Sequence, residues 1–303
     1  MPPNFLTSVS SHADHAVSRL RSTRLAASSK PYVARGSGGG RCAGCRLIAS
    51  HCICALRPAV PTRAGVCLIM GDIEALKPSN TGWLIADVVA DTWAFGWSRT
   101  AVDPALVALL ADPQWQPYVV FPAEYASPQR VVADLHAATG NAADASGKRP
   151  LFVLLDGTWA EARKMFRKSP YLDSLPVLSL HPEQVSGYRL RRSAHQHHFC
   201  TSEVAALCLA LAGETRAADA LAAWLDVFSA HYLSVKRHQP LDRESEAHQR
   251  LRALGLTPLG SALPPAAPAT AATAASPDNS LPQESSPECL PAPPSVPCPP
   301  TPP

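Results

Sequence analysis

The stretch LFVLLDGTWAEARKMFRKSP, residues 151–170, joins an apolar run to a helical pattern through a short polar segment. Its first five residues, 151–155, form the kind of continuous apolar run that fills a strand covered on both faces. Thr158, with Glu161 three residues later, matches a capping box at the start of a helix. The stretch therefore predicts a strand, a turn and a helix, with Asp156 at the carboxyl end of the strand.

The same alternation of apolar runs and helical patterns continues on both sides of this stretch. The runs expected to form strands are GVCLIM (65–70), TWAFGW (92–97), PYVVF (117–121), LFVLL (151–155) and PVLSL (176–180). The expected helices are TGWLIADVVA (81–90), PALVALLAD (104–112), PQRVVADLHAA (128–138), TWAEARKMFRK (158–168) and RAADALAAWLDVFSAHYLSVKRHQP (216–240). Strands and helices in alternation predict an α/β fold, with a mostly parallel sheet and helices on both faces. Ligands of such sheets bind beyond the carboxyl ends of the strands.

The two ends of the chain differ in composition from its middle. Residues 260–303 hold 14 of the 31 prolines and few large apolar side chains. Such a segment buries too little apolar surface to offset its ordering entropy, so we expect 241–303 to be a linker and a disordered tail. Residues 1–40, rich in Ser, Arg and Gly, are expected to be a disordered extension. A cysteine-rich segment, 41–60, and a main domain, 61–240, lie between them.

Hydropathy and charge set the broad class of the protein. No run of about 18 apolar residues occurs, so we expect no membrane span. The N-terminus lacks the apolar core of a secretory signal, which favours a cytoplasmic protein, and a mitochondrial transit peptide is the alternative that its Arg and Ser content allows. The net charge of +3 is modest, so an electrostatic argument for nucleic acid has to be local.

Four of the nine cysteines fall in one short stretch, RCAGCRLIASHCICALRP. Cys42 and Cys45 form a CxxC pair, and Cys52 and Cys54 form a CxC pair after six intervening residues. Two close pairs allow four thiolates to converge on one tetrahedral ion, which predicts a structural zinc site. The alternatives are a set of reduced or disulfide-bonded thiols, and a site in which His51 replaces one thiolate.

Polar residues also occupy two other loops expected at the carboxyl edge of the sheet. In KPSNTGWLIAD the residues Ser79, Asn80, Thr81 and Gly82 precede a helix, where hydroxyls and backbone N–H groups suit an anionic group. In FPAEY the carboxylate of Glu124 follows a strand, and its alternative interpretation is an ordinary surface residue. The sequence contains neither the GxGxxG pattern of dinucleotide sites nor a Walker sequence.

Basic residues outnumber acidic ones between Asp156 and Cys200, seven to four. We expect RNA phosphates to be contacted by Arg163, Arg167, Arg189 and Arg192. A solvated helix face is the alternative interpretation. The three histidines of HQHHFC lack a fixed helical spacing, which favours a surface that faces RNA over a metal site.

The run LLDGTWAEARKMF resembles the signature of the DTW-domain family, which is Asp, any residue, Thr, Trp. The similarity extends to the cysteine cluster, to KPSNTGWLIAD, to FPAEY and to YRLRRSAHQHHFCTSEVAALCLA, and it covers residues 41–235 with the bacterial branch most similar. The resemblance implies a tRNA-uridine aminocarboxypropyltransferase, which moves the 3-amino-3-carboxypropyl group of S-adenosylmethionine to N3 of a uridine and releases methylthioadenosine. It also implies a SPOUT-like trefoil knot.

The resemblance assigns roles to the residues singled out above. Uridine N3 becomes a nucleophile when it loses its proton, and Asp156 is the expected base. Thr158 would orient Asp156 or donate to a cofactor oxygen, and Trp159 would stack on adenine or uracil or cover the sulfonium. Residues 79–82 would hold the carboxylate of the cofactor, and Glu124 its ammonium group.

Two other functions fit the same residues. One is a SPOUT-type tRNA methyltransferase that uses S-adenosylmethionine, which would leave a methyl group on the tRNA. The other is a zinc-ribbon RNA-binding protein without catalysis, which would bind tRNA and release no methylthioadenosine.

Overall fold

The structure is a computed structural model, which describes residues 14–33, 40–132, 135, 147–180 and 199–256. The chain divides into two units after Ala262, and all described residues belong to the first unit, 1–262. Within the described residues, no helix is both long enough and apolar enough to cross a membrane.

Six strands form one sheet in the order β2–β1–β5–β3–β6–β4, and all neighbouring strands are parallel. They are β1 (Gly65–Met70), β2 (Thr92–Gly96), β3 (Trp115–Val120), β4 (Val131–Val132), β5 (Arg149–Asp156) and β6 (Val177–Leu178). Met70 of β1 lies opposite Asp156 of β5, so the two central strands end at the same level. The loops that follow them meet at one edge of the sheet.

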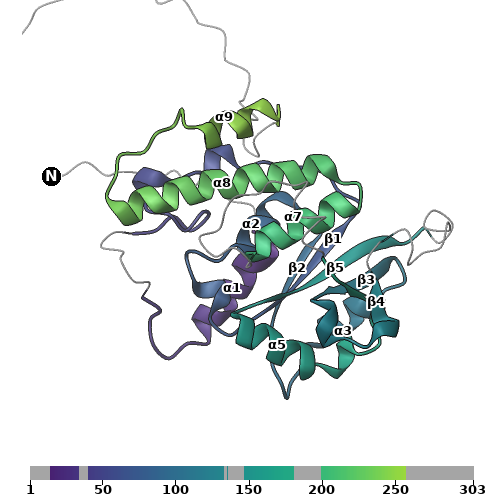
Figure 1. Cartoon of the computed structure of the whole chain (residues 1–303). Helices are drawn as coiled ribbons and strands as arrows, with labels where there is room; N and C mark the ends of the chain where they lie inside the picture. Colours follow the sequence, from purple (N-terminus) through teal and green to yellow (C-terminus); the bar gives the residue numbers. More distant parts are fainter. Residues whose placement is uncertain (1–13, 34–39, 133–134, 136–146, 181–198, 257–303) are drawn as a thin grey trace, which may run out of the picture. The chain divides into compact units, whose positions relative to one another are not determined.

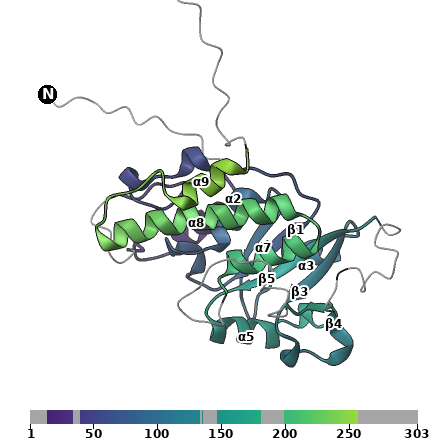
Figure 2. The ribbon, with the colours of Figure 1, turned by 45° about the horizontal axis from the view of Figure 1, so that its top comes forward.

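Helices cover both faces of this sheet, and α8 and α5 lie on opposite sides of it in both views (Figure 1, Figure 2). One face carries α2 (Gly82–Val88), α7 (Thr201–Leu211) and α8 (Thr215–Arg237), and the other carries α3 (Pro104–Ala111) and α5 (Trp159–Arg167). The 3₁₀ helices are Ala49–His51, Cys54–Leu56, Glu74–Leu76, Ala123–Tyr125, Pro128–Arg130 and Pro170–Leu172.

Strand β5 contributes to the core on both faces, which explains its continuous apolar run. Phe152 and Leu154 join the core under α8, here called the α8-side core. Leu151 and Val153 join the core under α5, here called the α5-side core. Side chains alternate along a strand, so Asp156 continues the phase of Phe152 and Leu154 and its carboxylate faces the α8 side.

The structure confirms the predicted α/β class and most of the predicted elements. The sheet is parallel throughout, and the five predicted strands coincide with β1, β2, β3, β5 and β6 within about two residues at each end. The helix predicted at 128–138 is wrong at its start. Pro128–Arg130 form a 3₁₀ helix, and β4 follows because Val131 and Val132 pair with β6. Of the remainder, only Leu135 is described.

Two helices lie outside the predicted cysteine-rich segment and main domain, 41–240. Helix α1 (Ala16–Ala26) lies within the predicted extension, and α9 (Glu246–Ala253) lies within the predicted linker. Helix α1 is held because it buries Val17 completely and because Arg21 donates to the carbonyl oxygens of Ala75 and Leu76. Residues 1–13 and 257–303 lie outside the described residues.

Candidate functional site

Asp156 is a buried carboxylate at the carboxyl end of β5, with 4% of its surface exposed. Its Oδ2 accepts a hydrogen bond of 2.8 Å from Nδ2 of Asn80, which precedes α2. Its Oδ1 accepts a hydrogen bond of 2.6 Å from Oγ1 of Thr201, the first residue of α7. One carboxylate therefore ties together a strand, a loop and a helix that lie far apart in the sequence.

The surroundings of Asp156 change its affinity for a proton. Burial raises the pKa of this carboxyl group, because the charged form loses its hydration, and the hydrogen bonds from Asn80 and Thr201 act in the opposite direction. A carboxylate that binds a proton more readily than one in water is suited to accept a proton from a substrate.

The loop predicted to bind an anion does lie beside Asp156. Asn80 is buried, and its Oδ1 accepts from the backbone N–H of Trp83, in the first turn of α2, at 3.1 Å. A Cβ atom on Gly82 would lie 2.6 Å from Oδ2 of Asp156, so this position requires glycine. Thr81 accepts from the backbone N–H of Ser202 at 3.4 Å. Asn80 and Gly82 therefore fix the position of the Asp156 carboxylate. Of the four predicted residues, Ser79 is exposed and Thr81 is half-buried, so these two can contact a ligand.

Arg46 connects the cysteine segment to the same loop, a link that sequence reasoning missed. Its side chain is buried, and Nη1 donates to the carbonyl oxygens of Lys77 at 3.1 Å and Asn80 at 3.0 Å. Its guanidinium lies 4.3 Å from the ring centre of Trp83. Burial lowers the pKa of Arg46 to about 9. The position of the loop therefore depends on the segment that contains the cysteines.

The four clustered cysteines converge as the spacing predicted. Their sulfur atoms all lie within 4.8 Å of one another. The Sγ atom of Cys42 is 3.6 Å from those of Cys52 and Cys54, and Cys45 is 3.7 Å from Cys52. Zinc–sulfur bonds of about 2.3 Å in a tetrahedron place sulfurs about 3.8 Å apart, whereas a disulfide requires about 2.0 Å. The cluster is thus a group of four thiols that can bind a metal such as zinc.

Thr158 caps helix α5 as the sequence indicated. Its Oγ1 accepts from the backbone N–H of Glu161 at 3.3 Å, and Oε2 of Glu161 accepts from the backbone N–H of Thr158 at 2.8 Å. The hydroxyl of Thr158 also donates to Oε2 of Glu161 at 2.6 Å. These hydrogen bonds lower the pKa of Glu161. Both side chains are therefore engaged in the capping box.

Trp159 lies on the other side of the sheet from the carboxylate of Asp156. Its ring is 42% exposed and stacks on Phe121, with ring centres 5.5 Å apart and planes 13° apart. Phe121 belongs to the α5-side core, whereas Asn80 and Thr201 bind Asp156 from the α8 side. The two residues share the carboxyl edge of the sheet, but their side chains do not form one cluster.

The other predicted site residues lie at the surface or outside the described residues. Glu124 is exposed within the 3₁₀ helix Ala123–Tyr125, and Arg167 is exposed near the end of α5. Arg163 is half-buried, and its guanidinium lies 5.8 Å from the ring centre of Trp159. Arg189 and Arg192 fall in 181–198 and lie outside the described residues, as do the three histidines of HQHHFC.

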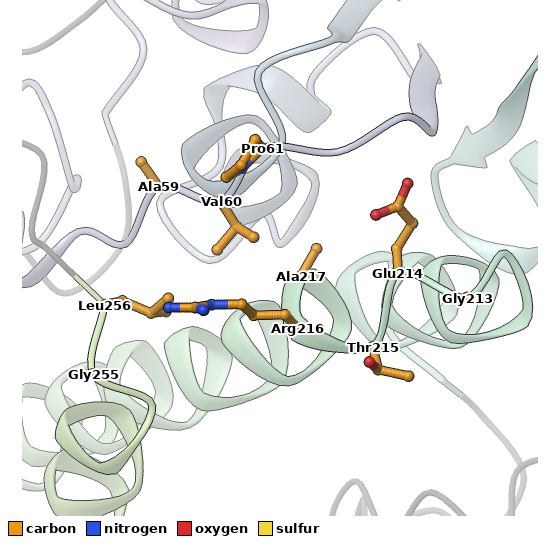
Figure 3. A pocket seen from close by; sticks show the side chains of 10 residues that line it. All are labelled: Ala59, Val60, Pro61, Gly213, Glu214, Thr215, Arg216, Ala217, Gly255 and Leu256. Carbon is orange, nitrogen blue, oxygen red and sulfur yellow. The ribbon is translucent and has the colours of Figure 1, made fainter.

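A pocket at the start of α8 contains none of these residues (Figure 3). Ala59, Val60 and Pro61 form one wall, and residues 213–217 with 255–256 form the other. The carboxylate of Glu214 accepts from the backbone N–H groups of Arg63 and Ala64 at 2.7 and 3.2 Å. Glu214 therefore joins the start of α8 to the segment that precedes β1. Asp156 therefore remains the candidate catalytic residue.

Thr201 is the second site residue that sequence reasoning missed. It is separated from Asp156 by 45 residues, and nothing local in the sequence indicates their hydrogen bond. The available signal was the pair of hydroxyl residues Thr201 and Ser202 ahead of the apolar run 204–211, since such residues begin helices.

A comparison with protein families matches the part of the chain that contains this site. A protein-family model described as "DTW domain" matches residues 39–233, which is more than half of the chain. No solved structure matches the chain. The matched region includes the cysteine cluster, all six strands and the Asp156–Trp159 signature. The chain therefore belongs to the DTW domain family.

Proposed function

We propose that the protein transfers the 3-amino-3-carboxypropyl group of S-adenosylmethionine to N3 of a uridine in tRNA and releases methylthioadenosine. The DTW domain, whose family is associated with this activity, supports the reaction class. The observation that carries the proposal is the buried, doubly hydrogen-bonded carboxylate of Asp156 at the carboxyl edge of a parallel sheet. Ligands of parallel sheets bind at this edge, and a carboxylate with a raised pKa can accept the N3 proton.

Asp156 is only 4% exposed, so we propose that it receives the proton through Thr201. The proton of N3 passes to Oγ1 of Thr201, and the hydroxyl proton of Thr201 passes to Oδ1 of Asp156 along their 2.6 Å hydrogen bond. Asp156 ends protonated, Thr201 is unchanged, and N3 is left with the electron pair that attacks carbon. Thr201 is half-buried at the start of α7, which gives it the access that Asp156 lacks.

S-adenosylmethionine supplies a carbon that bonds to N3 while its bond to sulfur breaks and the electron pair stays on sulfur. The task of the protein is to orient this carbon toward N3. Ser79 and Thr81 are proposed to bind the carboxylate of the donor, and Glu124 its ammonium group. Asn80 and Gly82 contribute indirectly, because they fix the carboxylate of Asp156.

We also propose that the four cysteines hold a structural zinc ion. Its effect on the site would pass through Arg46, which follows Cys45 directly and hydrogen-bonds the loop that carries Asn80. Metal content of the purified protein, measured by mass spectrometry, tests this assignment without reference to activity. About one zinc per chain is expected, and a folded protein free of metal would contradict it.

The remaining features that the resemblance implies belong to the same proposal. They are a place in the bacterial branch, action on tRNA in the cytoplasm, and a SPOUT-like knot. Residues 181–198, between β6 and α7, lie outside the described residues.

The reaction is tested by product analysis. The purified protein is incubated with unmodified tRNA transcripts and S-adenosylmethionine labelled in its aminocarboxypropyl chain, and both products are identified by mass spectrometry. We expect aminocarboxypropyl-uridine in the tRNA and an equal amount of methylthioadenosine. Methylated tRNA with S-adenosylhomocysteine would show a methyltransferase instead. Bound tRNA with neither nucleoside product would show an RNA-binding protein without catalysis.

A further inference from the structure

Two large aromatic side chains are exposed side by side next to the proposed site. Trp159 is 42% exposed and Tyr125 is 36% exposed. Their ring centres lie 5.7 Å apart with planes at 81°. Trp159 begins α5, directly beyond β5, and Tyr125 ends the 3₁₀ helix beyond β3. Both residues therefore stand at the carboxyl edge of two neighbouring strands, where ligands of parallel sheets bind.

A stack of buried rings holds this pair in place. Phe121 stacks on both Trp159 and Phe166, and the ring centres of Phe121 and Phe166 are 4.4 Å apart with planes 9° apart. Tyr125 also meets Phe121 edge to face, at 5.3 Å. The exposed rings are thus fixed before any ligand arrives, so binding a flat molecule to them costs little conformational entropy.

Basic residues lie along α5, the helix that carries Trp159. The guanidinium of Arg163 lies 5.8 Å from the ring centre of Trp159, and the ammonium group of Lys164 lies 5.4 Å from the ring centre of Trp97. Arg167 and Lys168 are exposed at the end of the helix. Among the described residues, none of these four cations forms an ion pair with a carboxylate. They can therefore contact anionic groups of a ligand.

We propose that Tyr125 and Trp159 form a stacking platform for a base of tRNA, with the cations of α5 on the adjoining phosphates. The inference rests on the proposed function, because it takes tRNA as the substrate. Stacked aromatic residues beside cations are typical of surfaces that bind single-stranded nucleic acid. RNA carries phosphates on both sides of every internal base, whereas S-adenosylmethionine carries none, so the cations favour RNA as the occupant.

The stacked base is a neighbour of the reacting uridine. Trp159 lies with the α5-side core, and the hydrogen bonds of Asp156 come from Asn80 and Thr201 on the α8 side. One base that stacks on Trp159 therefore does not present its N3 to Thr201. The platform would hold an adjacent base while the target uridine reaches the opposite side of the sheet edge.

Binding of unmodified tRNA in the absence of S-adenosylmethionine tests the platform. Trp159→Ala and Tyr125→Ala should each weaken tRNA binding about tenfold, since one lost base stack is worth about 1–3 kcal/mol and tenfold equals about 1.4 kcal/mol. Trp159→Phe should restore most of the affinity. The matched control is Val107→Ala, which trims a 40% exposed apolar side chain on α3 and should leave affinity within about twofold.

The salt dependence of tRNA binding distinguishes the contribution of base stacking from that of phosphate contacts. Arg167→Ala should reduce the slope of log K against log salt by about 0.7, as expected for one lost phosphate contact to a single strand. Trp159→Ala should lower the affinity and leave the slope unchanged. Wild-type affinity in both ring variants would overturn the proposal. If Trp159→Ala does not fold, Tyr125→Ala and Trp159→Phe decide the outcome.

Two further measurements distinguish the stacking platform from a cofactor site and test it separately from the proposed reaction. The affinity for S-adenosylmethionine should be unchanged in Trp159→Ala, and a selective loss of that affinity with normal tRNA binding would make the platform a cofactor site and overturn the proposal. If the wild type transfers the group and the ring variants bind tRNA normally, the platform is wrong and the proposed reaction stands. If the ring variants lose tRNA binding and the wild type transfers nothing, the platform stands and the reaction is wrong.

Discussion

The side-chain amide of Asn80 donates to the carboxylate of Asp156 across 2.8 Å, although 76 residues separate the two in the sequence. The oxygen of the same amide group also accepts from the backbone N–H of Trp83, in the first turn of α2. A single side chain therefore fixes both the start of a helix and the orientation of the proposed proton acceptor. Any change that moves Asn80 should alter stability and transfer together.

Gly82→Ala should disturb this arrangement directly. The new Cβ would lie 2.6 Å from Oδ2 of Asp156 and 3.3 Å from Oδ1 of Asn80, so the buried carboxylate has to shift. We expect a loss of about 1–3 kcal/mol in the free energy of unfolding, measured by urea denaturation, together with reduced transfer. Gly96→Ala is the control, because its Cβ would meet only Leu20, at 3.9 Å. Equal stability of the two variants would refute the crowding at Asp156.

Thr158→Ala should destabilise the protein whatever else this residue does. The variant loses the hydroxyl of the capping box, and loss of an N-cap costs about 0.5–2 kcal/mol. Thr158→Ser keeps the hydroxyl and should retain most of the stability. The free energies of unfolding of the three proteins check this expectation. An alanine variant as stable as the wild type would show that the cap contributes nothing.

The sequence predicts those parts of the fold that local patterns determine. The apolar runs 65–70 and 151–155 are strands because both faces of the central strands are buried. Strand β4 could not be predicted, because two valines form a strand only where β6 lies beside them. Its place within an expected helix shows tertiary contacts overriding local pattern.

Some residues of the candidate site could be predicted from local sequence patterns and others could not. Asp156 and the cysteine cluster followed from position and spacing within short stretches. Thr201 and Arg46 did not, because their partners lie 45 and 34 residues away and only the folded chain brings them together. The sequence also did not predict that Trp159 is separated from the carboxylate of Asp156, because this depends on the face of the sheet toward which each side chain points.

The cysteine cluster predicts a selective effect of mutation on metal content. Cys45→Ser removes one of the four sulfur atoms that lie within 4.8 Å of one another, so we expect loss of most of the bound zinc and a lower melting temperature. Cys289→Ser, in the segment predicted to be a tail, is the control and should keep about one zinc per chain. Metal analysis and thermal unfolding provide the measurements. Full zinc content in Cys45→Ser would contradict the predicted ligand set.

His15 predicts a specific pH dependence of stability. Burial lowers its pKa to about 3, and the nearby Arg57 contributes in the same direction. The unfolded chain, with the ordinary value of 6.5, takes up the proton first, so this contribution to stability is complete above pH 6.5 and is lost as the pH falls below it. His15→Asn should make the free energy of unfolding fall less steeply between pH 6.5 and 5. A slope remains, because the pKa values of His231 and His248 are also lowered.

The control for this prediction is His238→Asn. His238 is exposed, and it ends α8 with a φ of 52°, a left-handed conformation that asparagine adopts readily. The slope of stability against pH in this variant shows what the exchange of an exposed histidine for asparagine contributes by itself. Urea denaturation at a series of pH values measures all three proteins. An unchanged slope in His15→Asn would show that His15 is accessible to protons in the folded state.

The most direct measurement of the central claim is the single-turnover rate of aminocarboxypropyl transfer to tRNA in Asp156→Asn and Thr201→Val. We expect the rate to fall at least about a hundredfold in both variants, which is the usual contribution of a general base, with affinities for tRNA and S-adenosylmethionine close to wild type. Thr201→Ser, which keeps the hydroxyl, should recover most of the rate. Transfer at the wild-type rate by either Asp156→Asn or Thr201→Val would contradict the proposed path of the proton.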